Sequence, residues 1–146
     1  MIHGNVTLTQ PLSSSRQFVA VSGTGHAIVL DDANGDTGIK PIELVALGMA
    51  GCTAFDVINI LRKKRQQVTG YSVRIEADQK EEPPQVYTKV RIHHVITGFD
   101  VQAQAIEDAI KLSEEKYCSV GAMVQQSGAE VHTTYEIVQA PMPVTA

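Results

Sequence analysis

The sequence contains few aromatic residues and has no basic stripe, and both shortages exclude classes of function. Aromatic side chains make up 5% of the 146 residues, and none of them is tryptophan. A site that stacks sugars or bases on ring faces is therefore not expected. The formal net charge is −4, and the main cationic cluster, residues 62–65, lies at the end of a predicted helix. We therefore expect no nucleic-acid partner.

Cysteine is also scarce, since the chain has only Cys52 and Cys118. Neither belongs to a C-x-x-C motif, and the five histidines show no H-x-x-x-H spacing that would complete a zinc site. We expect neither a metal nor an organic cofactor. Residues 1–10 are polar and alternating rather than a secretory signal. This predicts a reducing, cytoplasmic location, where a cysteine pair is more often catalytic or metal-binding than a structural disulfide.

Three interpretations of the cysteines remain open from the residues alone. Free cysteine is commonly a small buried hydrophobic residue without chemistry. A Cys–His hydrolase is possible because its catalytic partners need not be neighbours in the sequence, although no local motif indicates one. The third interpretation is thiol redox chemistry. Small residues around Cys52 leave space near its sulfur. Cys118 lies between two predicted helices, where the N–H groups of residues 119–121 would favour a thiolate.

A long apolar stretch, residues 41–66, is predicted to form a single central helix. Between Leu44 and Leu61 the only ionisable groups are the Cys52 thiol and Asp56. Pro41 is typical of a first helical turn, and the basic residues 62–65 suit the negative end of the helix dipole. A helix that is apolar on nearly every face must be buried. Its length would allow a membrane span, but Asp56 and the lack of a second such run favour a soluble domain, so no membrane is expected.

The rest of the chain predicts an α+β fold in one domain of residues 1–146, with helices against one face of a largely antiparallel sheet. N-terminal strands and a loop occupy residues 1–38, a helix-bearing core residues 39–139 and a loose tail residues 140–146. Strands are expected at 3–9, 16–22, 26–30, 71–77, 86–96 and 130–138, and helices at 101–117, capped by Asp100, and 120–126. Because these elements cannot cover the central helix on every side, we predict a homodimer.

Two segments resemble the OsmC/Ohr family of osmotically inducible and organic-hydroperoxide-resistance proteins. They are residues 41–53, PIELVALGMAGCT, and residues 114–120, EEKYCSV. The similarity extends over nearly the whole chain, and both cysteines with their contexts agree with the family. It implies antiparallel sheets wrapped around a long central helix in an intertwined homodimer. It also implies thiol-dependent reduction of small organic hydroperoxides.

The resemblance implies a role for each cysteine. The thiolate of Cys52 would attack the peroxide and become a sulfenic acid, with which Cys118 would condense to a disulfide that an external dithiol reduces. No cofactor takes part. In the peroxidase members an arginine from the N-terminal strands, paired with a glutamate at the start of the central helix, lowers the thiol pKa. Arg16 and Glu43 are the candidates in this chain.

Two departures from the peroxidase pattern resemble less-characterised branches of the family. The glutamate of the peroxidases directly follows the helix-starting proline, where this chain has Ile42, and Glu43 comes one position later. One residue is about 100° of helix rotation, so Glu43 would face elsewhere. Ser119 follows the second cysteine, where proline is frequent in the family. The alternative function is therefore a non-catalytic redox sensor or a protein that binds a small hydrophobic ligand.

Overall fold

The computed structural model describes residues 1–142, which divide into two compact units, residues 1–45 and the residues from 46 onward. The long helix α1 (Pro41–Lys63) begins in the first unit and continues into the second. Each unit is described by itself. The predicted tail, residues 140–146, lies partly outside the described residues, since residues 143–146 do not belong to them. At its start, the backbone N–H of Ala140 donates to the carbonyl of Gly98 at 2.6 Å.

The first unit is a three-stranded antiparallel meander of β1 (Gly4–Leu8), β2 (Phe18–Ser22) and β3 (Ala27–Leu30). The predicted strands are present and are one or two residues shorter at their ends. Gly25 has φ +87° in the turn between β2 and β3, a backbone conformation that glycine adopts without steric cost. In the following loop the Asp32 carboxylate accepts hydrogen bonds from the N–H groups of Asn34 and Gly35. The Asp32 carboxylate therefore stabilises the turn that this loop makes.

Helix α1 ends three residues earlier than predicted and is buried along one stripe only. Arg65 adopts a positive φ of 59°, and the N–H of Gln66 bonds back to the carbonyl of Leu61, which terminates the helix. The buried positions recur with helical spacing at Met49, Ala50, Thr53, Val57 and Leu61. By length and composition α1 could cross a membrane, a property that core helices of soluble proteins share, and 28% of its most apolar window is buried within the chain.

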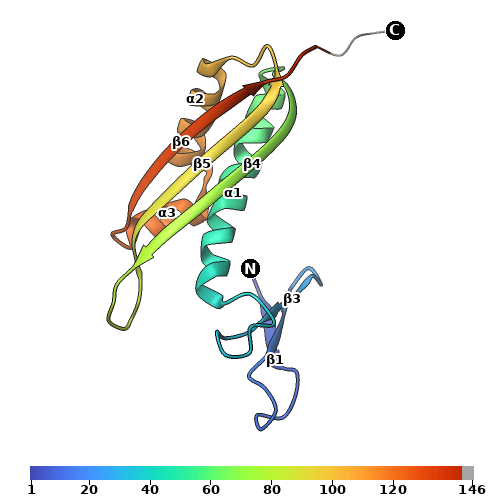
Figure 1. Cartoon of the computed structure of the whole chain (residues 1–146), viewed down its shortest axis with the longest axis vertical. Helices are drawn as coiled ribbons and strands as arrows, with labels where there is room; N and C mark the ends of the chain where they lie inside the picture. The colour runs from blue at the N-terminus through green and yellow to red at the C-terminus, as the bar shows by residue number, and fades with distance from the viewer. Residues whose placement is uncertain (143–146) are drawn as a thin grey trace. The chain divides into compact units, whose positions relative to one another are not determined.

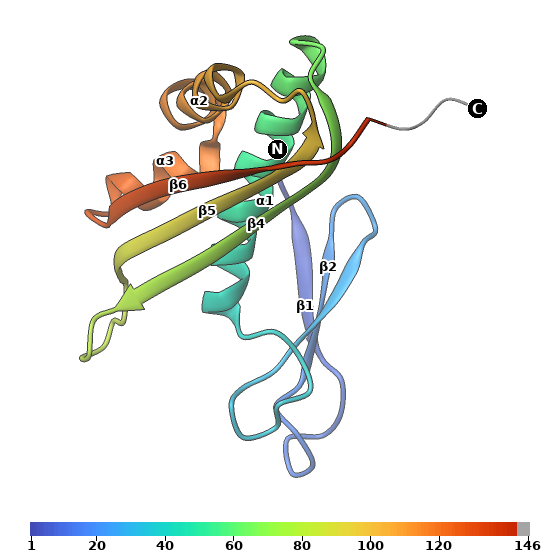
Figure 2. The same ribbon diagram turned by 45° about the horizontal axis from the view of Figure 1, so that its top comes forward.

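The second unit is built on a three-stranded sheet. Its helices lie against one face of that sheet (Figures 1 and 2). The strands β4 (Gln67–Gln79) and β5 (Tyr87–Phe99) form the expected antiparallel hairpin. The last strand, β6 (Glu130–Gln139), pairs parallel to β5. The sheet is therefore mixed rather than largely antiparallel. The helical connection between β5 and β6 returns the chain to the end of the sheet where β5 begins, and this forces the parallel pairing.

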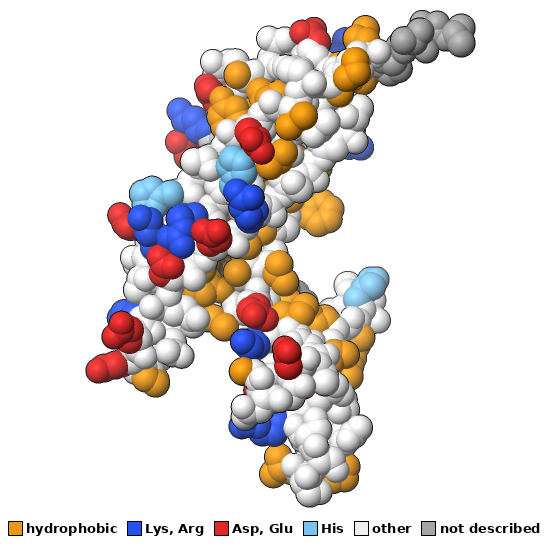
Figure 3. All heavy atoms as spheres, viewed as in Figure 1, with side chains coloured by type: hydrophobic (Ala, Val, Ile, Leu, Met, Phe, Trp, Pro, Cys, Tyr) orange, Lys and Arg blue, Asp and Glu red, His pale blue; other side chains and the backbone are white. Residues whose placement is uncertain are grey.

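The core of this unit lies between α1, β5 and α2 (Ala103–Leu112). Val57 and Leu61 of α1 pack there with Ile96 of β5 and Ile106 of α2, all of which are fully buried. Charged side chains gather over the opposite face of the sheet (Figure 3), where Arg91 pairs with Glu76 and with Asp78. This division gives each strand the alternation of apolar and polar residues seen in the sequence.

The segment between β5 and β6 departs from the predicted helix 101–117. Asp100 does not cap it, because Asp100 has φ +53° and the N-cap residue of α2 is Gln102. After α2 the chain forms a π-helical turn, η1 (Ser113–Tyr117), and then α3 (Ser119–Gln126), close to the predicted 120–126. The π-helical turn places Ser113 in the interior, where none of its surface is exposed.

Candidate active site

The two thiols, far apart in the sequence, lie next to each other in the second unit. The sulfurs of Cys52 and Cys118 and a carboxylate oxygen of Asp56 are all within 4.8 Å of one another. Both cysteines are free thiols. Cys52 is half-buried, whereas only 6% of Cys118 is exposed. The pair therefore has one sulfur that solvent can reach and one that is enclosed.

Local backbone structure positions each member of this cluster. Cys52 and Asp56 are four residues apart on α1, so their side chains lie on one face of the helix. Cys118 follows the π-helical turn and is the N-cap residue of α3, where its sulfur accepts a hydrogen bond from the N–H of Gly121 at 3.2 Å. A Cβ atom at Gly121 would lie 2.9 Å from that sulfur. Glycine is thus the residue that leaves room for the thiol.

Burial raises the pKa of the Cys118 thiol to about 12. A hydrogen bond with the Cys52 thiol and the nearby Asp56 charge act in the same direction, and the N–H of Gly121 opposes them. The helical junction predicted a stabilised thiolate at Cys118, and this expectation is wrong because desolvation outweighs the single N–H contact. The raised pKa favours the protonated thiol of Cys118 at neutral pH.

Asp56 was not predicted as a site residue, although the sequence carried a signal for it. It is the only charged residue between Leu44 and Leu61, and it stands one helical turn after Cys52. In the structure the hydroxyl of Ser113 donates to its Oδ2 at 2.9 Å and also lies 3.0 Å from Oγ1 of Thr53. Ser113 and Thr53 are both buried. The carboxylate is thereby held beside the sulfurs.

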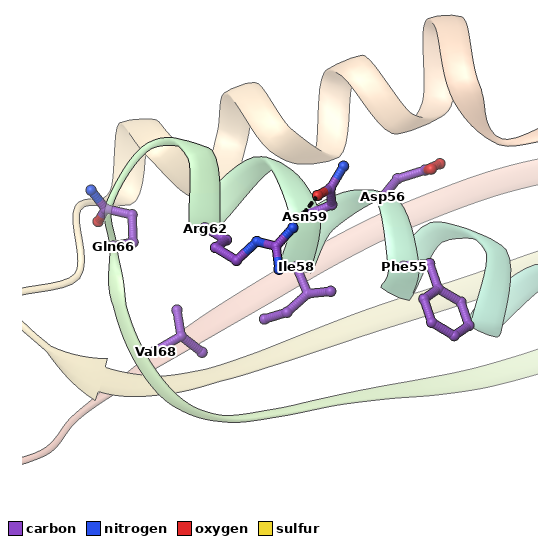
Figure 4. Close-up of a pocket in the computed structure, with 7 residues that line it drawn as sticks. All are labelled: Phe55, Asp56, Ile58, Asn59, Arg62, Gln66 and Val68. Atoms are coloured by element: carbon purple, nitrogen blue, oxygen red, sulfur yellow. Dashed lines mark hydrogen bonds between the residues drawn. The ribbon is translucent and has the colours of Figure 1, made fainter.

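Asp56 also borders a hollow of about 610 Å³ that runs along the exposed side of α1. Figure 4 shows the Asp56 carboxylate directed away from the ring of its neighbour Phe55, with Asn59 and Arg62 further along the helix. The hollow therefore has polar side chains, Asp56 and Asn59, and apolar ones, Phe55 and Ile58. Both apolar side chains are uncovered, since Phe55 is 79% exposed and Ile58 37% exposed. The thiol cluster therefore has solvent access beside an uncovered apolar surface.

The structure places Arg16 and Glu43 in the first unit, each with a partner of its own there. The guanidinium of Arg16 forms an ion pair with Asp32. The N–H of Gly35 and then the charge of Arg16 hold the pKa of the Asp32 carboxyl below its usual value. The Glu43 carboxylate accepts a hydrogen bond from the backbone N–H of Lys40 at 3.0 Å. This is half of a capping box and fits a role in starting α1. Their roles at the thiol pair stay predictions.

A thiol on a long apolar helix, with a second thiol beside it at the start of a short helix, defines a class of two-cysteine α+β proteins. Residues 33–134 match the model of the family described as OsmC-like protein. The chain belongs to the OsmC-like family, as the resemblance of residues 41–53 and 114–120 indicated. The fold expected from that resemblance, α+β with a long central helix, is confirmed.

Three relatives illustrate the similarity. Protein YhfA of Escherichia coli strain K12 is 38% identical over 123 residues, which cover 84% of this chain and 91% of YhfA. A protein of Aquifex aeolicus superposes with a TM-score of 0.84 at 29% identity, covering 97% of this chain and 98% of its own. The organic hydroperoxide resistance protein OsmC of Legionella pneumophila has a TM-score of 0.67 at 14% identity, over 93% of this chain and 96% of its own. This last likeness concerns the fold alone.

Proposed function

We propose that the protein reduces organic hydroperoxides with its two thiols in a reducing compartment such as the cytoplasm. Cys52, as a thiolate, attacks the distal peroxide oxygen, the O–O bond breaks, and the alcohol leaves with a proton from solvent. Cys52 is then a sulfenic acid. The sulfur of Cys118 attacks it, a disulfide forms, and water leaves with the thiol proton. An external dithiol reduces the disulfide and restores both thiols.

The observation that carries this proposal is the adjacency of one accessible and one enclosed sulfur within 4.8 Å. A sulfenic acid on Cys52 would have Cys118 as its nearest reaction partner. The assignment of roles follows from burial. A thiol with a pKa near 12 is a poor first nucleophile at neutral pH. Cys118 therefore suits the second step, and Cys52 the first. Membership in a family that includes organic hydroperoxide resistance proteins supports the reaction class.

Two copies of the chain are part of this proposal. Helix α1 carries exposed apolar side chains at Leu47, Phe55 and Ile58, and the last two line the hollow that Asp56 borders. Contiguous apolar surface of this kind marks an interaction site. A second α1, which offers the same surface, would bury it across a two-fold axis. The peroxide would then react in a pocket that water reaches less easily.

A non-catalytic redox sensor is the second candidate, and two features favour it. A carboxylate oxygen of Asp56 lies within 4.8 Å of both sulfurs, and its charge disfavours a thiolate at Cys118. Arg16, the predicted activating cation, is paired with Asp32. With a weakly activated Cys52 the same thiols would oxidise slowly and report on peroxide rather than remove it.

Thiol titration separates the two functions. The reduced protein is mixed with one equivalent of cumene hydroperoxide, and free thiols are counted with time. Rapid loss of two thiols per chain supports the peroxidase, whereas thiols that survive millimolar peroxide support the sensor. Cys52→Ser should abolish the reaction, while Cys118→Ser should allow one turnover that stops at the sulfenic acid. Equal loss in both variants contradicts the assigned roles.

A further inference from the structure

The same three side chains suit a second ligand of a different class. We propose that Cys52, Cys118 and Asp56 of the reduced protein bind one thiophilic divalent cation of the Zn²⁺ class, with a fourth position left for water or another exogenous ligand. Two thiolates and a carboxylate are ligand types that Zn²⁺ takes in proteins. The proposal does not rest on peroxidase activity, since it concerns the protein in the absence of peroxide.

The distances suit this cation. Tetrahedral Zn²⁺ with Zn–S bonds of about 2.3 Å separates two sulfurs by about 3.8 Å. The ligand atoms of Cys52, Asp56 and Cys118 already lie within 4.8 Å of one another. Closing on the ion therefore requires a contraction of about 1 Å at most.

The cluster has the outer contacts that orient ligands in metal sites. Ser113, of which no surface is exposed, donates a hydrogen bond to Oδ2 of Asp56 at 2.9 Å. The N–H of Gly121 donates to the sulfur of Cys118 at 3.2 Å. The carboxylate ligand Asp56 and the sulfur ligand Cys118 are thus each oriented by a hydrogen bond from another residue of the chain. Such partners typically change metal affinity 10- to 100-fold when they are removed.

The cluster has a path to solvent and carries negative charge that a cation would offset. Asp56 borders the hollow along α1, and Cys52 is half-buried, so an ion can enter from that side. Two sulfurs alone would not make a zinc site, which is why the sequence predicted none. Asp56 adds the third ligand from the same face of α1 as Cys52. Binding releases the two thiol protons, and the cation offsets three negative charges that would otherwise repel one another.

The consequence is that metal binding and disulfide formation compete for the same sulfurs. A bound ion holds both thiolates in coordination, so neither is free to attack. Conversely, the Cys52–Cys118 disulfide has no thiolate to offer. The site would store the thiols in a form protected from oxidation and would release the ion when a disulfide forms.

Cobalt titration tests the proposal. The full-length, reduced protein is titrated anaerobically with Co²⁺, and tetrahedral thiolate coordination is detected by the ligand-field bands and the sulfur-to-cobalt charge-transfer band. We expect one Co²⁺ per chain, displacement by Zn²⁺, and no binding after oxidation to the disulfide. Octahedral spectra without a charge-transfer band would overturn the proposal, as would a stoichiometry clearly below one.

The variants isolate the third ligand. Asp56→Asn keeps both thiols and nearly the same volume, and we expect at least a 10-fold loss of Co²⁺ affinity. Ser113→Ala should lose about 10-fold. Cys52→Ser and Cys118→Ser should each lower the charge-transfer intensity. Asp36→Asn, in the loop of the first unit, serves as the charge-matched control and should bind as the wild type does. Unchanged affinity in a folded Asp56→Asn protein, verified by circular dichroism, would refute Asp56 as a ligand.

Discussion

The hydroxyl of Ser113 lies 2.9 Å from Oδ2 of Asp56 and joins the π-helical turn to the helix that carries Cys52. Ser113 is fully buried and Asp56 is half-buried, so removing the hydroxyl leaves a partly desolvated carboxylate oxygen without its donor. Such a loss costs about 1–3 kcal/mol. We therefore expect Ser113→Ala to lower the free energy of unfolding by about 1–3 kcal/mol in urea titrations. The exposed Ser119→Ala, six residues further along, should change it by less than about 0.5 kcal/mol. Equal effects would mean that the hydroxyl contact contributes nothing.

The raised pKa of Cys118 predicts a different pH dependence of alkylation for the two thiols. The reactive species is the thiolate, and its fraction at Cys118 grows only as the pH approaches about 12. Iodoacetamide labelling, read for each peptide by mass spectrometry, should therefore modify Cys52 first at every pH below that value. The charge of Asp56 contributes to the raised pKa of Cys118, so Asp56→Asn should move the labelling midpoint of Cys118 to lower pH. An unmoved midpoint would exclude that charge as a cause.

Acid should destabilise the second unit through His94. This residue is fully buried in β5, and the hydroxyl of Tyr71 lies 2.6 Å from its Nδ1. Among the described residues its Nε2 is buried without a hydrogen-bond partner. Burial, followed by the charge of His93, lowers the pKa of His94 to about 4. The unfolded chain then binds the proton more readily than the folded chain.

Stability should accordingly fall as the pH drops from 6.5 toward 4, by an amount on the order of 3 kcal/mol. Urea titrations across this range measure the decline. In His94→Gln, which keeps a polar partner for Tyr71, the decline should flatten although the protein starts less stable. A decline of the same slope in the variant would assign the acid sensitivity to other groups.

The sequence predicted those features that local chemistry determines. Pro41 and the basic residues after Leu61 indicated both ends of α1 to within three residues, and alternation indicated most of the strands. The pattern could not give the direction of β6, because a strand with one apolar face reads the same in parallel and antiparallel pairing. That direction depends on how the preceding helices cross the sheet.

For the site, too, the sequence indicated individual residues but not how they are arranged in space. Both cysteines stood out because they were the only two, and their contexts matched a family. Their adjacency required the fold, since nothing in the spacing of Cys52 and Cys118 brings the sulfurs together. Asp56 was visible as the one charge in an apolar helix. Its significance depended on Ser113, whose burial follows from a π-helical turn that propensities do not predict.

The close approach of Gly121 to the Cys118 sulfur predicts that a larger residue at position 121 would disturb the thiol site. A methyl group there would lie 2.9 Å from the Cys118 sulfur, so Gly121→Ala should displace the thiol and cost about 1–3 kcal/mol of stability. Gly51→Ala is the matched helical control, because no described atom beyond its chain neighbours and the backbone of its own helical turns lies within 4 Å of its added carbon. In Gly121→Ala, disulfide formation after peroxide treatment should also slow. A Gly121→Ala protein as stable and as reactive as Gly51→Ala would show that the sulfur moves aside freely.

Phe55 offers the sharpest test of whether two copies of α1 share a surface. Phe55 is 79% exposed on the chain alone and lines the hollow along α1. If a second copy covers it, Phe55→Glu places a charge in an apolar interface, where an unpaired carboxylate is costly. Light scattering should then give a dimer for the wild type and a monomer for the variant. Met123 is 68% exposed on α3, so Met123→Glu adds the same charge at an apolar position on a different helix and should remain dimeric. A monomeric wild type would reject the shared surface, and dissociation of both variants would place the contact elsewhere than α1.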